Sequence, residues 1–149
     1  MTTPAPPQTQ LRPKAMAQTH AAAFELTRPW SAREFSELIE SPSCFVVGTA
    51  QCFALARLIP DEAELLTIAT HPDHQRQGRA KTVMDTLHTQ LQTRGAAQVF
   101  LEVAAPNLAA LALYESLGYH HVGSRKAYYT PTSGGEALDA IVMQRKLPF

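Results

Sequence analysis

Cysteine is scarce in this sequence: Cys44 and Cys52 are the only two among 149 residues. Two cysteines are too few for a disulfide scaffold, and no C-x-x-C motif is present. The pair could face each other across a hairpin, but reduced cysteines in the core are the better interpretation.

Long apolar runs are also missing. No segment approaches the length of a membrane span, and the first ten residues lack the apolar core of a signal peptide. Those residues are rich in Pro, Thr and Gln, so we expect a disordered, Pro-rich tail over residues 1–9. These absences favour a soluble, cytoplasmic protein without a membrane partner.

A net charge is lacking as well, because Lys plus Arg and Asp plus Glu both total 13. Nonspecific nucleic-acid binding normally requires a basic balance, so we expect no direct nucleic-acid partner, although a local basic patch is compatible with these totals. The two common nucleotide patterns, G-x-G-x-x-G and G-x-x-x-x-G-K-[ST], are absent too.

The chain does contain enough apolar residues for a core. Hydrophobic residues make up 45% of it, and 149 residues suit one globular domain, which we place at residues 10–149. Hydrophobic periodicity and turn residues predict an α+β fold, a mixed and mostly antiparallel twisted sheet flanked by helices. Strands are expected at 10–12, 44–48, 52–58, 62–70, 99–103, 119–126 and 138–146, and helices at 14–26, 31–40, 79–94 and 107–117.

The most informative segment is the turn Gln-Arg-Gln-Gly-Arg-Ala at residues 75–80. It joins a predicted strand to a predicted helix, whose first N–H groups have no intrahelical partners. With the helix dipole these donors form a seat for phosphate, and Gly78 lets the backbone approach the anion closely. Arg76, Arg79 and Lys81 add positive charge. Taken alone, the same residues are equally compatible with an ordinary exposed turn.

Two downstream segments give this turn its meaning: Leu-Glu-Val-Ala-Ala-Pro-Asn at 101–107 and Ala-Leu-Tyr-Glu-Ser-Leu-Gly-Tyr at 112–119. Together with the turn they resemble the GNAT superfamily of N-acetyltransferases. Its acetyl-CoA motif, Q/R-x-x-G-x-G/A, is matched by Gln75, Gly78 and Ala80, with alanine in place of the commoner second glycine. The resemblance implies the GNAT acyl-CoA N-acyltransferase fold, with acetyl-CoA as cosubstrate and no metal.

Further segments resemble the RimI-like branch of that superfamily, whose acceptor is the N-terminal alanine of a ribosomal protein. They include Pro29–Ser31, Asp73, Leu113–Gly118 and Tyr128-Tyr129, and the resemblance covers roughly residues 10–147. It implies direct acetyl transfer, in a ternary complex, to the N-terminal α-amino group of a small-subunit ribosomal protein. The implied partners are acetyl-CoA and that N-terminal peptide, and we expect a monomer or a weak dimer.

Within this resemblance Glu102 corresponds to the proton acceptor and Tyr114 to the proton donor. Glu102 ends a short apolar strand, and an α-amino group with a pKa of about 8 asks little of a base. A phenol with an ordinary pKa of about 10 is a good acid and a poor base at neutral pH, so Tyr114 would protonate the departing thiolate. The alternatives are a solvated strand-end carboxylate for Glu102 and core packing for Tyr114.

The remaining site residues rest on the same resemblance. Backbone groups of the strand end at 68–70 are expected to run beside the pantetheine arm and to polarise the thioester carbonyl. Trp30, Tyr128 and Tyr129 would line the acceptor groove, with core packing an equal alternative for Trp30, and the loop at 130–136 could act as a lid. The cofactor-binding set is Ile68, Ala69, Thr70, Arg76, Gln77, Gly78, Arg79, Ala80, Lys81 and Asn107, of which Asn107 would also cap its helix.

Two other functions compete with this interpretation. A GNAT enzyme for small-molecule amines such as polyamines would need a strongly acidic groove, and few acidic residues fall near the candidate groove. A non-catalytic acetyl-CoA-binding module would be expected to lack the pair of Glu102 and Tyr114. A metal site is not expected, because Pro72 interrupts the H-x-x-H spacing of His71 and His74 and no third ligand is evident.

Overall fold

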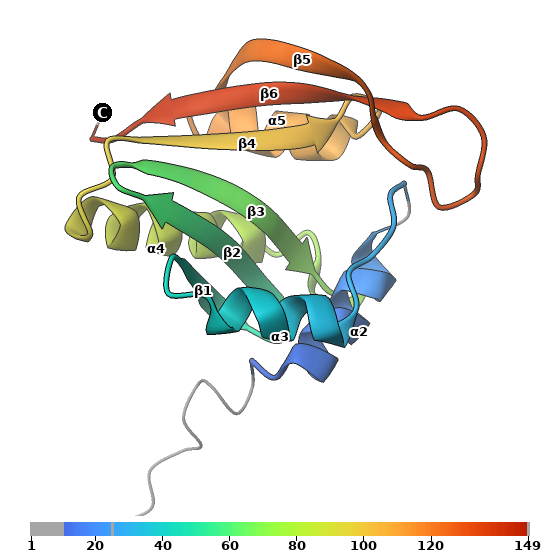
Figure 1. Cartoon of the computed structure of the whole chain (residues 1–149), viewed down its shortest axis with the longest axis horizontal. Coiled ribbons are helices and arrows are strands. Elements are labelled where there is room, and N and C mark those ends of the chain that lie inside the picture. Colours follow the sequence, from blue (N-terminus) through green and yellow to red (C-terminus); the bar gives the residue numbers. More distant parts are fainter. Residues whose placement is uncertain (1–10, 25, 149) are drawn as a thin grey trace, which may run out of the picture.

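The computed structural model describes residues 11–24 and 26–148. Its centre is a six-stranded sheet with the order β1-β2-β3-β4-β6-β5 (Figure 1). Neighbouring strands are antiparallel except β3 and β4, which are parallel, so the predicted α+β fold with a mixed, mostly antiparallel sheet is confirmed. The strands are β1 (Cys44–Thr49), β2 (Cys52–Ile59), β3 (Glu62–Thr70), β4 (Gln98–Ala104), β5 (His120–Tyr129) and β6 (Leu138–Lys146).

Helices lie on both faces of the sheet (Figure 1). The helices α2 (Pro13–Ala23) and α3 (Ala32–Glu40) pack on one face against β1–β3, while α4 (Arg79–Thr93) and α5 (Leu108–Ser116) pack on the other. Each pair of helices covers its own hydrophobic cluster, so the sheet separates two cores. Over β4, β6 and β5, the face opposite α5 carries no helix within the described residues (Figure 1).

Local signals explain where the helices begin. Ser31 caps α3 as predicted, since its side chain accepts the Glu34 N–H while the Glu34 side chain accepts the Ser31 N–H. The expected strand at 10–12 is wrong for Leu11 and Arg12, and Gln10 lies outside the described residues. Arg12 is instead the N-cap of α2, because proline at the first helical position favours a helix start there.

Other predictions hold with small shifts in bounds. The helix expected at 14–26 ends at Ala23, and β5 runs to Tyr129 rather than 126. Cys44 and Cys52 are both buried and free, which agrees with reduced core cysteines. The tail expected over residues 1–9 lies outside the described residues, and none of the described helices is long and apolar enough to cross a membrane.

The neighbouring strands β3 and β4 separate part-way along their length. They pair only from Glu62 opposite Gln98 to Leu65 opposite Leu101. Beyond that point β3 stays paired with β2 and β4 stays paired with β6. The facing edges, at 66–70 and 102–104, therefore present N–H and C=O groups that no partner strand satisfies. We call this opening the split.

A bulge in β3 lies at the start of the split. Thr67 is opposite Leu55 and Leu65 is opposite Ala56, so Leu66 is an extra residue in the strand. A bulge shifts the alternation of side chains by one position. As a result Leu65 belongs to the cluster under α4, whereas Ala69 belongs to the cluster under α2 and α3.

His20 of α2 forms a side-chain hydrogen bond with Thr67, next to the extra residue of this bulge. Its Nε2 lies 2.9 Å from Thr67 Oγ1, and its Nδ1 accepts the Trp30 N–H at 2.9 Å. A backbone N–H can only donate, so Nδ1 is the acceptor and Nε2 carries the proton that is donated to Thr67. Burial lowers the pKa of His20 to about 4, which keeps the ring neutral in this role.

Candidate active site

The turn at Arg76–Lys81 presents a row of free backbone donors. None of the N–H groups in this stretch has an acceptor among the described residues, and the N-cap of α4 receives no side-chain bond. The first backbone bond of the helix comes from Thr82, whose N–H donates to the Gly78 carbonyl at 3.1 Å. Such a row at a helix N-terminus is the arrangement that binds phosphate.

Two residues of this turn adopt the left-handed conformation. Gly78 has a φ of 73°, and a Cβ added there would meet nothing within 4 Å, so open space faces the backbone. Arg76, with a φ of 62°, takes the same conformation although it has a side chain. Ala80 lies inside the first turn of α4. The requirement for glycine therefore falls on position 78, and alanine at 80 is an ordinary helical residue.

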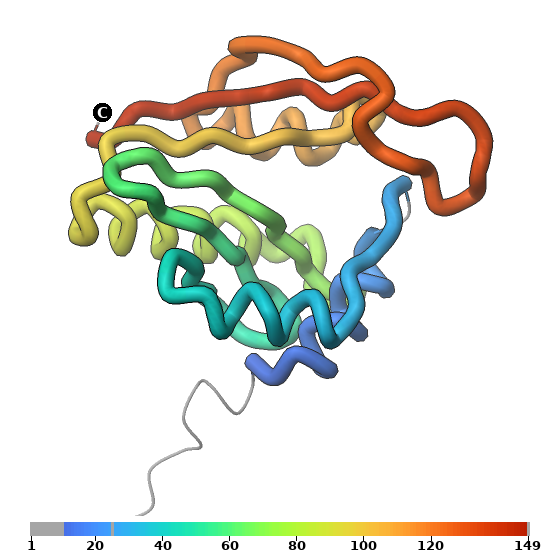
Figure 2. Tube along the Cα trace, in the orientation of Figure 1, coloured from blue at the N-terminus to red at the C-terminus, as the bar shows by residue number. Residues whose placement is uncertain are grey.

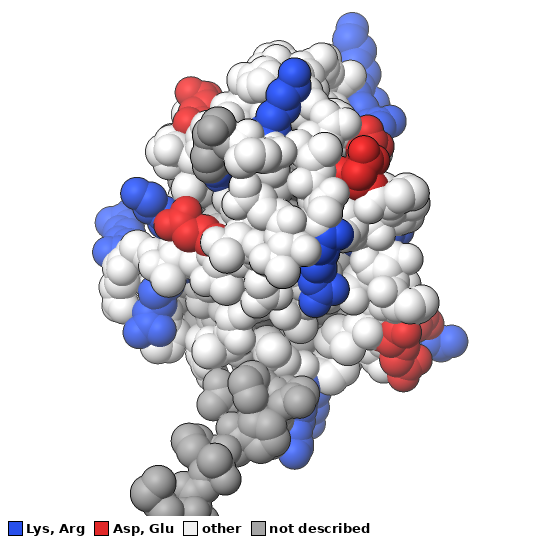
Figure 3. Space-filling model, turned by 90° about the vertical axis from the view of Figure 1, so that its left-hand side faces the viewer, with Lys and Arg blue, Asp and Glu red and all other residues white. Residues whose placement is uncertain are grey.

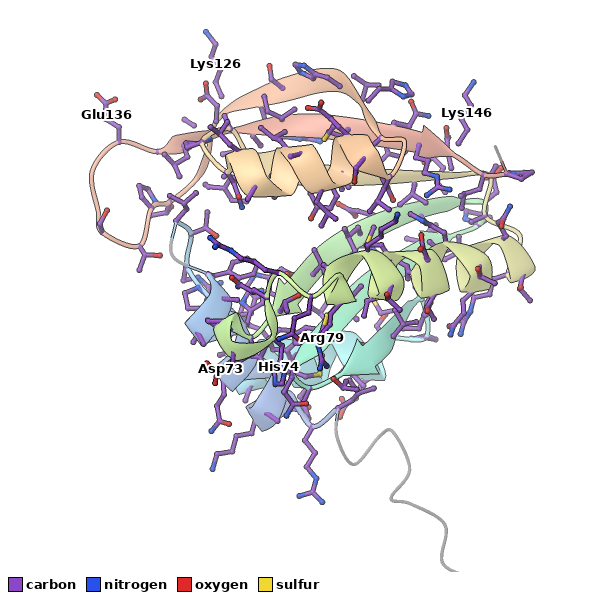
Figure 4. The ribbon with its side chains drawn as sticks, turned by 180° about the vertical axis from the view of Figure 1, so that it is seen from behind. Asp73, His74, Arg79, Lys126, Glu136 and Lys146 are labelled. Carbon is purple, nitrogen blue, oxygen red and sulfur yellow. The ribbon has the colours of Figure 1, made fainter. Side chains whose placement is uncertain are left out.

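Side chains add support around the turn. Gln75 Nε2 donates to the Thr70 carbonyl at 3.0 Å and ties the turn to the end of β3. Arg79 Nε donates to Gln77 Oε1 at 3.1 Å. Asp73, His74 and Arg79 lie together at this end of α4 (Figure 4). The strand end Ile68–Thr70 leads directly into this region and is paired on its β2 side alone.

Glu102 stands on β4 at the other edge of the split. Its register partner is Val142, so its side chain lies on the face opposite α5, whereas Leu101 and Val103 are buried under α4 and α5. The side chain is 16% exposed, and Oε2 lies 3.1 Å from Arg125 Nε of β5. That oxygen is buried, and its contact with Arg125 is an ion pair without hydrogen-bond geometry.

Tyr114 comes from α5, on the opposite face of the sheet. It is buried, and burial raises the pKa of its phenol, with the neighbouring Tyr129 adding to the effect. Its ring meets that of Tyr119 edge-on, with centroids 5.8 Å apart. No hydrogen bond occupies its hydroxyl within the described residues. Asn107, whose side chain accepts the Ala110 N–H at 3.2 Å, caps the same helix as predicted.

Tyr119, which contacts Tyr114, belongs to a buried polar cluster with His88 and Arg145. Its hydroxyl lies 2.7 Å from His88 Nε2, and Arg145 Nη1 lies 2.6 Å from His88 Nδ1. Burial lowers the pKa of His88 to about 4, and the charge of Arg145 adds to the effect. The neutral ring thus accepts from Arg145 and donates to Tyr119, which fixes the Tyr119 ring against Tyr114.

Two of the three predicted acceptor residues lie beside Glu102. The rings of Tyr128 and Tyr129 are 5.0 Å apart, and the Arg125 guanidinium lies 5.6 Å from the Tyr128 ring. Burial raises the pKa of both tyrosines, and the charge of Glu102 adds to the effect. Trp30 packs instead into the cluster under α2 and α3, its ring centroid 5.2 Å from that of His20. The core-packing alternative for Trp30 therefore has direct contacts in its support.

The β5–β6 loop meets the segment between α2 and α3, although the two are far apart in the sequence (Figure 2). Thr27 and Pro131 form an isolated β-bridge, and the Thr132 N–H donates to the Leu26 carbonyl at 3.2 Å. These contacts hold the loop against the segment between α2 and α3. The loop and this segment together form a wall, meaning a barrier at one end of the open sheet face.

Sequence reasoning missed Arg125, which lies against both Glu102 and Tyr128. It reaches Glu102 because β4 and β5 both pair with β6, and the sequence pattern does not specify that strand order. Charge patterning gave no signal either, because both signs are scattered on the surface, as one face shows (Figure 3). Among the described residues, no group of three or more His, Cys, Asp or Glu side chains is arranged to hold a metal ion.

Comparison with known proteins agrees with this geometry. The sequence matches the Acetyltransferase (GNAT) family over residues 11–119. The ribosomal protein bS18-alanine N-acetyltransferase of Escherichia coli is 41% identical over 119 residues, which cover 77% of this chain and 79% of that protein. The crystal structure of the ribosomal-protein-S18-alanine N-acetyltransferase from Escherichia coli matches with a TM-score of 0.80 at 34% identity, covering 92% of this chain and 88% of that one.

A more distant structure has the same fold. NAA60 of Arabidopsis thaliana, solved in complex with acetyl-CoA, matches with a TM-score of 0.77 at 16% identity, covering 93% of this chain and 95% of that one. GNAT acetyltransferases use acetyl-CoA as the acetyl donor. The family match and the 41% identical relative show that this chain belongs to the GNAT family of acetyltransferases.

Proposed function

We propose that this chain transfers the acetyl group of acetyl-CoA to the N-terminal α-amino group of a protein, and that the acceptor is the N-terminal alanine of a small-subunit ribosomal protein. The observation that carries the proposal is the split between β3 and β4, which has Glu102 on one edge and, beyond the end of the other edge, the free N–H groups of Arg76–Lys81. The bS18-alanine acetyltransferase of Escherichia coli, 41% identical over 119 residues, supports the choice of acceptor. Ribosomal proteins are made in the cytoplasm, which is where the proposal places the enzyme.

The free N–H groups of Arg76–Lys81 would hold the pyrophosphate of acetyl-CoA. The unpaired edge of Ile68–Thr70 would bind the pantetheine arm as a further strand would, and one of its N–H groups would polarise the thioester carbonyl. When bound, acetyl-CoA supplies an acetyl group activated as a thioester. The residues on this side act mainly through their backbone.

Glu102 and Tyr114 would handle the two protons of the reaction. The Glu102 carboxylate, paired with Arg125, would accept a proton from the α-ammonium group of the acceptor, directly or through one water, and the neutral amine would then attack the thioester carbonyl. Burial raises the pKa of Tyr114, so the phenol keeps its proton and donates it to the departing CoA thiolate. The acceptor would approach over the open face that carries Glu102, and Tyr114 would act from the α5 side of the sheet.

The wall made by the β5–β6 loop and the α2–α3 segment favours a chain end over an internal residue. A polypeptide that passes through the site would have to continue across the β-bridge of Thr27 and Pro131, where the Thr132 N–H donates to the Leu26 carbonyl. A free N-terminus can enter from the open side and stop there. The rings of the half-exposed Tyr128 and the partly buried Tyr129 would line this entrance.

The test is acetylation of two matched peptides, with CoA thiol release as the readout. One carries the first residues of a bS18 protein with a free N-terminal alanine, and the other carries the same residues with that amine already blocked. We expect thiol release with the first peptide and none with the second. Equal release with both, through lysine side chains, or release with spermidine alone would overturn the proposed acceptor.

A further inference from the structure

The strand β5 contains an irregular segment beside the proposed acceptor site. Arg125 is opposite Ala140 and Tyr129 is opposite Leu138 in β6, so the segment 126–128 faces the single residue Asp139. A bulge of this kind bends the strand and redirects its side chains. Arg125 itself stays in register, 3.1 Å from the Glu102 carboxylate, and the bulge that follows it places the centroid of the Tyr128 ring 5.6 Å from the guanidinium.

The bulge depends on one unfavourable backbone conformation. Ala127, at its centre, has a φ of 53°, in the left-handed region that side-chain-bearing residues rarely adopt. Such a conformation persists where surrounding contacts fix it. The contact here is a hydrogen bond from the Ala127 N–H to Asp139 Oδ1 at 2.9 Å. A bond to an ionised carboxylate is among the stronger ones available to a backbone N–H.

The same Asp139 is also bonded to the strand that carries Glu102. Its backbone carbonyl accepts the N–H of Ala105, the residue just after β4, at 2.9 Å. One residue therefore joins the bulge that carries Tyr128 to the end of the strand that carries the proposed base. The residue is exposed, so its carboxylate fills no space in either core.

We propose that Asp139 is a positioning residue for acetyl transfer, which sets the place of the Tyr128 ring relative to Arg125 and Glu102 through the bulge. This inference rests on the proposed function and adds a residue that touches neither acetyl-CoA nor the acceptor. Without the carboxylate, Ala127 relaxes to a negative φ and the acceptor side of the site loses its shape. The phosphate seat, on the far side of the split, is unaffected.

The test compares Asp139→Ala with Lys126→Ala, a control in the same bulge whose side chain points away from the molecule (Figure 4). With the N-terminal alanine peptide, we expect Asp139→Ala to raise the peptide KM about tenfold while the acetyl-CoA dissociation constant stays within about twofold of the wild-type value. Asp139→Asn keeps an acceptor oxygen and should recover most of the loss, and Lys126→Ala should behave as the wild type.

A second substitution tests the backbone argument. Glycine takes the left-handed conformation freely, so adding Ala127→Gly to Asp139→Ala should lower the peptide KM again. Unchanged kinetics in Asp139→Ala, or a loss of folding or of acetyl-CoA affinity along with the peptide affinity, would overturn the inference. If the wild type itself fails to acetylate the peptide, the proposed function has failed, and the inference falls with it.

Discussion

The two sides of the split differ in the kind of chemical group that is proposed to act there. On the β3 side the functional groups belong to the backbone: the free N–H groups of Arg76–Lys81 and the unpaired strand edge at 66–70. On the β4 side they belong to side chains, namely Glu102, Arg125 and, from α5, Tyr114. A backbone site depends on conformation and tolerates changes of side chain, whereas a side-chain site depends on the identity of each residue. Substitutions on the two sides should therefore change the kinetics of the enzyme in different ways.

The largest effect is expected from Glu102→Gln, which removes the proposed base and keeps the shape of the side chain. We predict a fall in kcat of about 100-fold at neutral pH, with acetyl-CoA affinity nearly unchanged. Because the α-amino group loses its proton by itself above a pKa of about 8, the deficit should shrink as the assay pH rises toward 9. Stopped assays across that pH range, with calorimetry for acetyl-CoA, measure both quantities.

Glu64→Gln is the matched control for this change. Glu64 is a half-exposed carboxylate of β3 that also carries an ion pair, at 2.8 Å from Arg57. Its loss should leave kcat within about twofold of the wild type, because an exposed pair contributes little. Wild-type turnover in Glu102→Gln, or an equal loss in both variants, would remove Glu102 from the role of base.

Tyr114→Phe should come next, with kcat lowered between about 10-fold and 100-fold and acetyl-CoA affinity retained. The control is Tyr119→Phe, another buried phenol, whose hydroxyl is bonded to His88 instead of facing the split. That change should lower the midpoint of thermal unfolding and leave kcat within about threefold, since it removes a buried hydrogen bond. If the two variants lose kcat equally, Tyr114 acts through packing and not as an acid.

The β3 side should show a smaller effect of another kind. Gly78→Ala places a side chain on a residue with a φ of 73°, where it also projects into the space proposed for the phosphate. We predict an acetyl-CoA KM raised about tenfold with kcat little changed. Arg79→Ala, which removes an exposed cation and keeps the backbone, should change that KM by only about twofold. A larger loss from Arg79→Ala than from Gly78→Ala would contradict a seat built from the backbone.

The smallest effect concerns stability, because each face of the sheet holds one buried histidine. The pKa values of His20 and His88 are lowered from about 6.5 to about 4 by burial. The unfolded chain therefore binds protons below pH 6.5 that the folded chain does not, and the free energy of unfolding should fall as pH drops from 6.5 toward 4. The slope is on the order of 1 kcal/mol per pH unit for each histidine.

Urea unfolding at pH 7, 6 and 5 measures this dependence. The window above pH 5 isolates the histidines, since Glu34, whose pKa is lowered to about 2 chiefly by Arg28, loses its contribution only below its ordinary pKa of about 4.5. A free energy of unfolding that stays constant from pH 7 to pH 5 would contradict neutral, buried histidines on both faces.

The sequence allowed most of the fold and the centre of the site to be predicted, because those parts depend on local patterns. The capping box at Ser31, the glycine at 78 and the alternation in β3 all act within a few residues. The split escaped prediction because it is a missing pairing between two strands that are each well formed. Arg125 escaped because its contact with Glu102 depends on how β4 and β5 pair with β6, and the bulge beside it escaped because alanine at position 127 gives no sign of a positive φ.

The contact of Trp30 with His20 also has a practical use. The sequence contains a single tryptophan, so its fluorescence comes from one place in the molecule. That place is joined through His20 and Thr67 to the bulge where the two strands part. Emission from the unmodified protein would therefore serve as a local optical probe of this joint, and titration with acetyl-CoA could be followed without attaching a dye.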